Sequence, residues 1–236
     1  MKEIIRSTED VLVMLDHLLK EERTFDWDQF YSDRRRGIPF FADLPDENLV
    51  RYFREGRFQA GSKVLELGCG PGRNAFFFAE KGCEVDAADS SKEALRWAEE
   101  RARERGVKIN FLHENIVDLQ ISEGSYDIVY DSGCLQHIAP HRRSAYLELV
   151  DKALRPGGFF SVVCFVPGGN LGGAEISDWD VYRLKSLQGG LGFTEDRLKM
   201  IFNRFQAIEM REMTGARDEP VFSEKGLRTA LFQKQK

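Results

Sequence analysis

The stretch Val64-Leu-Glu-Leu-Gly-Cys-Gly-Pro-Gly-Arg-Asn74 decides the fold of this chain. An apolar run ends in an acid, Glu66, and three glycines then stand at alternate positions, Gly68, Gly70 and Gly72. Glycine permits a tight turn and removes the side chains that would keep a ligand away from the backbone. The stretch therefore predicts a buried strand that turns abruptly into a helix and leaves bare backbone for a ligand.

A second acid follows at a distance that suits a nucleoside. The apolar run 83–88 ends in Asp89, seventeen residues after Gly72. An acid at the tip of the strand beside the glycine turn suits the two hydroxyls of a ribose. Ser90 is either a second ribose contact or the cap of the following helix, in which Glu93 stands at capping-box spacing. The turn and Asp89 together indicate a cofactor that contains a nucleoside.

The spacing of the glycines distinguishes two such cofactors. The dinucleotide fingerprint G-x-G-x-x-G would have its last glycine at position 73, where this chain has Arg73. Glu66 would also repel a pyrophosphate, whereas it suits an ammonium group, directly or through a water. An oxidoreductase that uses a nicotinamide dinucleotide is therefore the less favoured interpretation.

On these residues the chain resembles the class I S-adenosylmethionine-dependent methyltransferases, whose first motif is similar to residues 66–72. The resemblance covers roughly residues 60 to 235. It implies S-adenosyl-L-methionine as the cofactor. It also implies the following cofactor-binding residues: Glu66, Gly68, Cys69, Gly70, Gly72, Asp89, Ser90, Asn115, Ile116 and Asp131.

Within that resemblance, Asn115 and Ile116 take the position that contacts adenine. An asparagine side chain can hydrogen-bond the exocyclic amine or a ring nitrogen, and an isoleucine gives the ring an apolar surface. Asn115 also suits a plain turn, since asparagine readily hydrogen-bonds nearby backbone. Both interpretations of Asn115 stay open.

The segment 131–138 follows the fourth expected strand and, by the resemblance, lies between cofactor and acceptor. It reads Asp131-Ser-Gly-Cys-Leu-Gln-His-Ile138 and lacks the Asp/Asn-Pro-Pro-aromatic motif of enzymes that methylate nucleic-acid bases. Asp131 and His137 are the candidate catalytic residues. A general base is needed only if the acceptor binds protonated, and a histidine has the more useful reference pKa, about 6.5. His137 suits a structural role equally. Pro140 separates it from His141, which argues against a metal site on a helix.

A doubly wound α/β fold is predicted from the alternation of patterns. Strands are expected at 63–67, 84–88, 107–112, 126–131, 159–166, 205–212 and 226–233, and helices at 8–22, 26–35, 43–56, 73–81, 90–105, 142–154 and 195–203. Such alternation predicts a seven-stranded, mainly parallel sheet with helices on both faces. The final pair of strands has no helix between them and predicts an antiparallel edge strand. We expect residues 1–58 to form a helical extension and residues 59–236 the core domain.

Composition argues against several other classes of function. The chain has 236 residues, 42% of them hydrophobic, which suits one domain with a sizeable core. Its net charge of −5 does not fit a surface that binds nucleic acid. No apolar stretch reaches the ~18 residues of a membrane span and the N-terminus lacks a signal-peptide core, so a cytoplasmic protein without membrane contact is expected. The four cysteines form no C-x-x-C pair, which is typical of reduced thiols.

The pattern most resembles the small-molecule branch that includes thiopurine and tellurite-resistance methyltransferases. The likeness depends on residues 72–82, on 131–146 and on the aromatic segment Trp27–Tyr31. It implies a methyltransferase with a small-molecule acceptor that works by direct in-line transfer. The long segment 167–193 is expected to form a lid together with the N-terminal helices, over the acceptor side of the pocket. Trp179 and Tyr182 either line that pocket or pack inward from a short helix at about 178–187. A regulator that binds the cofactor without transferring a methyl group is the remaining alternative.

Overall fold

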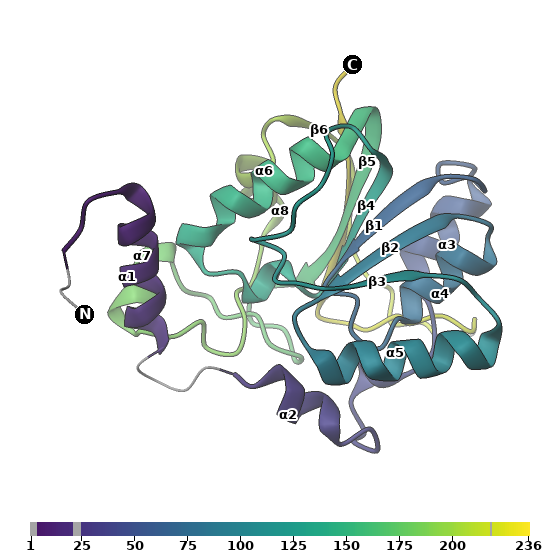
Figure 1. The fold of residues 1–236 in the computed structure, drawn as a ribbon, viewed down its shortest axis with the longest axis horizontal. Coiled ribbons are helices and arrows are strands. Elements are labelled where there is room, and N and C mark those ends of the chain that lie inside the picture. Colours follow the sequence, from purple (N-terminus) through teal and green to yellow (C-terminus); the bar gives the residue numbers. More distant parts are fainter. Residues whose placement is uncertain (1–3, 21–24, 218) are drawn as a thin grey trace.

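The computed structural model describes residues 4–20, 25–217 and 219–236. Within these residues the chain forms one sheet of seven strands in the order β3-β2-β1-β4-β5-β7-β6, with helices on both faces (Figure 1). The strands are β1 (Lys63–Leu67), β2 (Glu84–Asp89), β3 (Asn110–His113), β4 (Tyr126–Ser132), β5 (Leu154–Phe165), β6 (Phe205–Glu212) and β7 (Leu227–Lys234). The predicted fold class is therefore confirmed.

Eight α-helices and three short 3-10 turns are present in the described residues. The helices are α1 (Thr8–Lys20), α2 (Trp27–Ser32), α3 (Glu47–Arg54), α4 (Arg73–Glu80), α5 (Lys92–Arg105), α6 (Arg143–Ala153), α7 (Asp178–Arg183) and α8 (Glu195–Ile201). The 3-10 turns are η1 (Pro39–Phe41), η2 (Leu135–His137) and η3 (Pro140–Arg142). The end of the expected helix 8–22 falls on residues 21 and 22, which lie outside the described residues. None of the described helices has the length and apolar character needed to cross a membrane.

The order of the strands places the glycine turn near the middle of the sheet. Strand β1 pairs in parallel with β2 on one side and with β4 on the other. Strand β7 runs antiparallel to both of its neighbours, β5 and β6, so the antiparallel strand lies one place inside the edge that β6 forms. The strand order reverses direction between β1 and β4, which is where ligands bind in such sheets.

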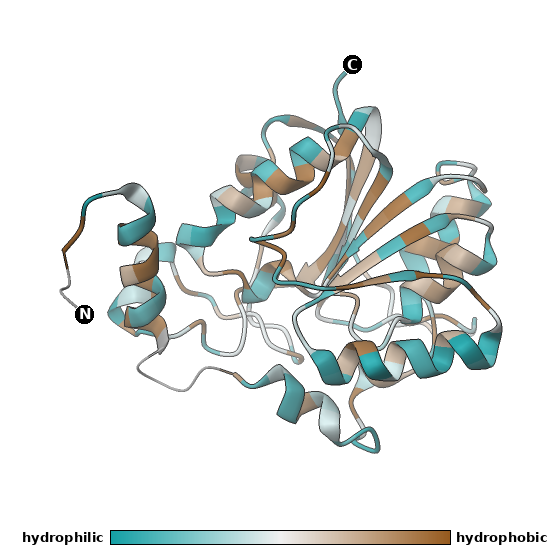
Figure 2. Ribbon diagram, in the orientation of Figure 1, coloured by the Kyte–Doolittle hydropathy of each residue, from teal (hydrophilic) through white to brown (hydrophobic). Residues whose placement is uncertain are grey.

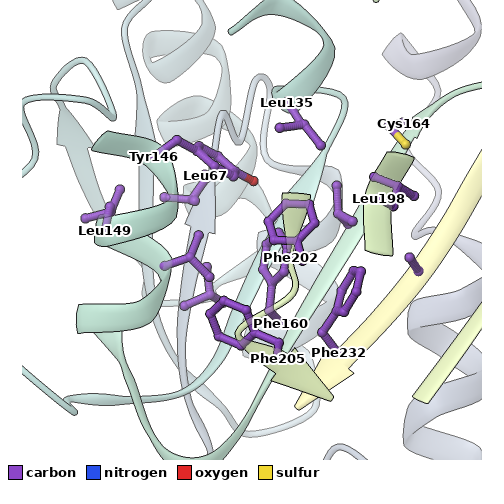
Figure 3. Close-up of a cluster of buried hydrophobic side chains, with 14 of the residues drawn as sticks. Leu67, Leu135, Tyr146, Leu149, Phe160, Cys164, Leu198, Phe202, Phe205 and Phe232 are labelled. Carbon is purple, nitrogen blue, oxygen red and sulfur yellow. The ribbon is translucent and has the colours of Figure 1, made fainter. Parts of the chain in front are cut away.

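The strands are rich in hydrophobic residues, which Figure 2 colours brown, and their buried side chains belong to two large apolar clusters. On the α6 and α8 face, Phe160 of β5 packs with Phe202 and Phe232, with ring centroids 5.0 Å and 6.0 Å from its own (Figure 3). On the opposite face, Leu49 and Tyr52 of α3 are fully buried in the cluster that contains β1 and α4. The third N-terminal helix is therefore packed into the same core as the sheet.

The first two N-terminal helices are arranged differently. Helix α1 lies across α7 at one end of the molecule, and α2 lies along α5 (Figure 1). Helix α2 spans six residues, which is shorter than the expected 26–35. Tyr31 of α2 belongs to a separate small cluster, whereas Leu19 of α1 is partly buried against the main core cluster.

Two expected boundaries are wrong by a few residues. The cap of α5 is Ser91, whose hydroxyl accepts a hydrogen bond from Ala94 N at 3.1 Å. Ser90 is exposed and is not the cap. The reason is that Asp89 accepts a hydrogen bond from Ser91 N at 2.8 Å, which closes the turn one residue later than the sequence spacing predicts.

The start of β5 was also predicted too late. Helix α6 ends at Ala153, and Leu154 already pairs with Tyr126 of β4. The glycines that were expected to separate helix from strand instead lie within β5, at an irregularity where the register shifts between Tyr126 and Ile128. Gly157 has a φ of 80°, a backbone conformation that glycine adopts without strain.

Candidate functional site

The turn after β1 is closely surrounded by other side chains. Gly68, Gly70 and Gly72 have φ values of 66°, 52° and 86°, a left-handed region in which other residues are strained. A Cβ atom on Gly68 would lie 2.9 Å from Cys134 Cβ, and one on Gly70 would lie 3.1 Å from Tyr31 Oη. The turn therefore requires glycine both for its backbone and for the space that the α2 and β4 segments occupy.

Glu66 places a carboxyl group in the interior directly before this turn. Its side chain is 2% exposed, and Oε2 has no hydrogen-bond partner among the described residues. Burial raises the pKa of Glu66 to about 8, against the opposing effect of the Arg73 guanidinium. An unpartnered buried carboxyl oxygen is costly, so this position suits a ligand that carries a positive charge or a hydrogen-bond donor.

A buried polar network that the sequence analysis missed supports the turn from the α3 side. The fully buried carboxylate of Asp46 accepts hydrogen bonds from Arg73 Nη1, Asn74 Nδ2 and Tyr130 Oη. Arg73 Nη2 donates to Ser132 Oγ at 2.9 Å. Arg73 thus links α3, α4 and the end of β4. In the sequence Asp46 differs in no visible way from an ordinary acid at the start of a helix.

Asp89 connects the glycine turn to α5. Its Oδ2 accepts from Gly70 N and its Oδ1 from Ser91 N, both at 2.8 Å. Burial raises the pKa of Asp89, while these two backbone donors oppose the shift. Each carboxylate oxygen can accept a further hydrogen bond. Ser90, by contrast, is exposed, and its carbonyl oxygen lies 3.1 Å from His113 Nε2.

The two residues predicted to contact adenine lie in different environments. Ile116 is 5% exposed and packs in the core cluster that contains Leu67. Asn115 is exposed, and its Oδ1 accepts a hydrogen bond from Val117 N at 3.2 Å. The turn role that the sequence left open for Asn115 is therefore present in the structure, and its contact with adenine stays a prediction.

At the end of β4, Asp131 is fully buried and holds the next turn in place. Its carboxylate accepts from the backbone N–H groups of Cys134 and Leu135 and from Tyr146 Oη, at 2.8, 3.1 and 2.6 Å. Burial raises the pKa of Asp131 to about 7, and these donors oppose the shift. The side chain thereby fixes the path of segment 131–138 over the cofactor turn.

His137 lies among aromatic rings. Its ring centroid is 5.0 Å from that of Trp27 in α2 and 6.1 Å from that of Phe165 in β5, both edge to face. A Cβ on Gly190 would lie 3.2 Å from His137 Cε1. Burial lowers the pKa of His137 to about 4, so the imidazole is neutral at neutral pH. Phe165 and Gly190 lie in other segments of the chain, and only the fold brings them next to His137.

His141 is bound to other protein groups on both ring nitrogens. Nδ1 lies 2.9 Å from Tyr182 Oη, and Nε2 lies 2.8 Å from Asp16 Oδ1 of α1. Arg142 also pairs with Asp16, at 2.6 Å. In the described part of the chain no group of three or more His, Cys, Asp or Glu side chains is arranged to hold a metal ion. Trp179, for which the sequence left a pocket-lining and an inward-packed position open, is 76% exposed.

Helix α2 covers the glycine turn and is bound to α5. Asp28 Oδ1 accepts hydrogen bonds from Ser91 Oγ at 2.7 Å and from Glu93 N at 3.2 Å, and Arg34 pairs with Glu100. Tyr31, on the inner face of α2, is 7% exposed. Helix α2 therefore brings Tyr31 to the glycine turn and Trp27 to His137.

Two hollows lie away from this region. One of about 290 Å³ lies between α6, α8 and the start of β6, and the other, of about 200 Å³, lies between α5 and β3. Neither is lined by a residue that the sequence predicts to bind the cofactor. The glycine turn, with its bare backbone and unpartnered carboxyl oxygen, is the better candidate for the functional site.

Comparison with known proteins gives consistent results. Residues 64–158 match a family described as a methyltransferase domain. An uncharacterized methyltransferase of Synechocystis sp. is 32% identical over 123 residues, which are 52% of this chain and 53% of that protein. A ubiquinone biosynthesis O-methyltransferase of Pectobacterium carotovorum is 37% identical over 112 residues, 46% of this chain and 45% of the relative. The chain thus spans about half the length of these curated relatives.

Solved structures show the same fold at lower sequence identity. One chain, from a study of the conversion of a disulfide bond into a thioacetal group during echinomycin biosynthesis, has a TM-score of 0.69 and 21% identity. The match covers 89% of this chain and 90% of that chain. At this identity the likeness concerns the fold alone.

Proposed function

We propose that the chain is a class I S-adenosylmethionine-dependent methyltransferase, which binds S-adenosyl-L-methionine at the glycine turn and transfers the methyl group to a small-molecule acceptor. Residues 64–158 match a methyltransferase domain, which supports this proposal. The observation that carries this proposal is the buried Glu66 oxygen without a partner, directly before a turn of bare glycine backbone. A cofactor with an amino group and a sulfonium would supply the missing positive charge.

The residues of the turn fit this cofactor. Glu66 would hold the amino group, directly or through a water, and the methionine part would lie along the bare backbone of the turn. Asp89 keeps accepting capacity on both carboxylate oxygens and lies at the end of β2, where it would receive the ribose hydroxyls. Ile116 would give adenine an apolar surface, with Asn115 beside it, and Cys69 would contribute backbone within the glycine turn. We leave Ser90 out of the ribose site, since it is exposed.

When bound, S-adenosyl-L-methionine supplies a methyl group that its sulfonium already activates. The residues of the chain then have to align the acceptor and exclude water, and positioning of this kind lowers a bimolecular barrier by about 7–11 kcal/mol. Tyr31 of α2 would cover the turn and Trp27 would cover His137, so that both exclude water. Because burial lowers the pKa of His137 to about 4, the imidazole is a weak base, and it would take up a proton only from an acceptor group that becomes strongly acidic as the methyl group is transferred.

Asp131 takes a positioning role in this proposal. Its carboxylate already accepts three hydrogen bonds from within segment 131–146, so it orients Cys134 and the residues up to His137. It need not touch the acceptor to matter for the rate. We accordingly assign catalysis to His137 and the shape of the segment to Asp131.

The small-molecule acceptor is supported by the relatives and by charge. The Pectobacterium protein is named for ubiquinone biosynthesis, which involves a small molecule, and the chain has a net charge of −5.

We also propose that α1, α2 and segment 167–193 form a lid, since Asp16 of α1 binds His141 and His141 binds Tyr182 of α7. Removing residues 1–40 should then raise the KM of cofactor or acceptor, and an unchanged KM in a folded protein would reject the lid.

Calorimetry with the purified chain tests the cofactor. We expect binding of S-adenosylmethionine and S-adenosylhomocysteine and none of NADH. Asp89→Ala should weaken cofactor binding by about 1–3 kcal/mol, the usual cost of losing hydrogen bonds to a charged group. Glu84→Ala, on an exposed side chain of the same strand, is the matched control. Wild-type affinity in Asp89→Ala would remove the ribose assignment.

A second assay separates the enzyme from a non-catalytic binder. The chain is incubated with methyl-labelled S-adenosylmethionine and pooled cell metabolites, and the label is followed into products. An enzyme yields a labelled small molecule. A regulator that only binds the cofactor yields none, although it gives the same calorimetric result.

A further inference from the structure

Gln136 carries a buried side-chain oxygen that the protein leaves without a partner. The residue is 3% exposed, and no donor among the described residues reaches its Oε1. Leaving such an atom unsatisfied costs about 1–3 kcal/mol, so its presence in a well-packed region needs an explanation. An apolar residue of similar size would avoid this cost.

Other buried atoms without a partner have simpler explanations. Apart from Glu66, they belong to side chains whose remaining nitrogens are bound: Asn48 donates to Tyr130 and Ser161, and Arg51, Arg143 and Arg228 form ion pairs. For Gln136 the described part of the chain shows no such second side-chain bond. Gln136 therefore differs from Asn48, whose Oδ1 also lacks a partner, in that, among the described residues, neither end of its carboxamide is bonded to another side chain.

The position of Gln136 points to the acceptor side of the site. The residue lies in η2, directly after β4, and a Cβ on Gly133 would lie 3.4 Å from its Nε2. Cys134 of the same segment packs on Gly68 of the glycine turn. The next residue, His137, lies between the rings of Trp27 and Phe165. A carboxamide and several flat rings are thus brought together beside the cofactor turn.

The basic side chains on and beside this segment are already paired. Arg73, which donates to Ser132, is paired with Asp46, and Arg142 and Arg143 are paired with Asp16 and Asp178. An anionic acceptor would find no free cation among these residues, whereas an uncharged flat molecule would find rings for stacking and an oxygen that needs a donor.

We propose that Gln136 determines acceptor specificity, and that the acceptor is an uncharged planar ring compound that offers an N–H or O–H donor to Gln136 Oε1. This inference rests on the proposed methyltransferase function and narrows its substrate class. Gln136 recognises the acceptor in this scheme and takes no part in the transfer itself.

Two probes that differ in one donor test the proposal. 2-Pyridone is a flat, uncharged lactam with an N–H, and N-methyl-2-pyridone has the same ring without the donor. Their binding to the wild-type chain saturated with S-adenosylhomocysteine is measured by NMR titration. We expect 2-pyridone to bind about tenfold more tightly, the factor that one well-formed hydrogen bond supplies. No binding of 2-pyridone, or equal binding of both probes, overturns the proposal.

The variant Gln136→Met separates recognition from folding. Met fills a similar volume without a polar group, so we expect an unchanged or higher Tm, affinity for S-adenosylhomocysteine within about twofold, and loss of the preference for 2-pyridone. Gln206→Met, on an exposed strand, is the control and should keep the preference. A lower Tm in Gln136→Met than in the control would show a structural role and overturn the inference.

The two proposals fail in different ways. If S-adenosylhomocysteine does not bind the wild-type chain, the methyltransferase function fails. If it binds but the two probes bind equally, only the role of Gln136 fails.

Discussion

The turn after β1 and the turn after β4 lie side by side, since Leu67 pairs with Asp131, yet they are built in different ways. The first is formed by backbone: three glycines in left-handed conformations lie within five residues of each other. Around the second, the rings of Trp27 in α2 and Phe165 at the end of β5 contact His137, and the backbone of Gly190 lies close to it. The turn that we assign to the cofactor, the cofactor half, is thus set by consecutive residues, whereas the one that we assign to the acceptor, the acceptor half, is shaped by distant segments that the fold brings together.

The same contrast holds for the two buried carboxyl groups of these turns. Burial raises the pKa of Glu66 to about 8 and that of Asp131 to about 7. Asp131 is satisfied by three donors of its own segment, whereas Oε2 of Glu66 has no donor among the described residues. One carboxyl group therefore serves the protein and the other is left for a ligand.

The largest effect is expected where the cofactor half depends on a buried ion pair. Asp46→Ala removes the partner of Arg73, and both side chains are at most 8% exposed. Leaving the guanidinium buried and unpaired should lower the free energy of unfolding by about 3–5 kcal/mol, measured by urea denaturation. Glu219→Ala, which breaks an exposed pair with Arg54, should cost less than about 1 kcal/mol. Equal losses in the two variants would contradict this account of the network.

Glu66→Gln and Asp131→Asn should have opposite effects on the free protein. A carboxyl group whose folded pKa lies above its unfolded value lowers stability as pH rises between the two values. For Glu66 that window runs from 4.5 to about 8. Glu66→Gln removes this penalty and should raise the free energy of unfolding at pH 8 by a few kcal/mol. By the same rule Asp131 lowers stability between pH 3.8 and about 7. Asp131→Asn removes that penalty but also replaces one acceptor oxygen with an NH2 group that faces donors, so we expect it to be less stable than the wild type.

Chemical denaturation across pH 5 to 8 measures the stability of both variants. Calorimetry adds a second test, the direction in which protons move when the cofactor binds. A cation bound beside Glu66 lowers the pKa of that carboxyl group, so cofactor binding near pH 7 should release a proton from the wild-type chain and none from Glu66→Gln. Proton release is read from the dependence of the binding heat on buffer. If the two proteins release protons equally, Glu66 does not face the ligand.

The cofactor half was largely predictable from the sequence because its determinants are local. Residues 64–74 specify strand, turn and helix in consecutive positions, and Asp89 lies at the tip of the next strand in the structure as predicted. The error at Ser90 is one residue long. It arose because both Ser90 and Ser91 can cap a helix and only the hydrogen bond from Ser91 N to Asp89 decides between them.

The acceptor half could not be predicted in the same way. In the sequence, more than a hundred residues separate Trp27 from His137 and Phe165, and no periodicity relates the three. Sequence spacing likewise gives no sign that Asp46 is buried or that Gln136 lacks a donor. Such facts depend on how side chains meet after the whole sheet has formed. For the same reason the sequence could not decide between a pocket-lining and an inward-packed Trp179, which lies on α7 and is 76% exposed.

Detaching α2 from α5 is a smaller change that affects both halves. Asp28→Ala removes the acceptor of the Ser91 hydroxyl and of Glu93 N, so local opening of α2 should become easier by about 1.5 kcal/mol. The amide protons of Phe30 and Tyr31 should then exchange about tenfold faster, while protection in β1 and β4 stays unchanged. Asp33→Ala, at the exposed end of α2, is the control. Unchanged exchange would show that Asp28 does not hold the helix.

The smallest effect is expected from a substitution that changes the acceptor side of the site and leaves the cofactor side unchanged. Trp27→Ala removes a ring beside His137 but no contact with the glycine turn that depends on charge. An edge-to-face pair contributes about 1 kcal/mol beyond its buried area, so the acceptor KM should rise about fivefold. The affinity for S-adenosylhomocysteine should not change. Trp27→Phe should restore most of the loss, because a ring alone is required, and Trp179→Ala should match the wild type, because that ring is exposed. A loss of cofactor affinity equal to the rise in KM would mean that α2 serves both sites, and that the two turns are one functional unit.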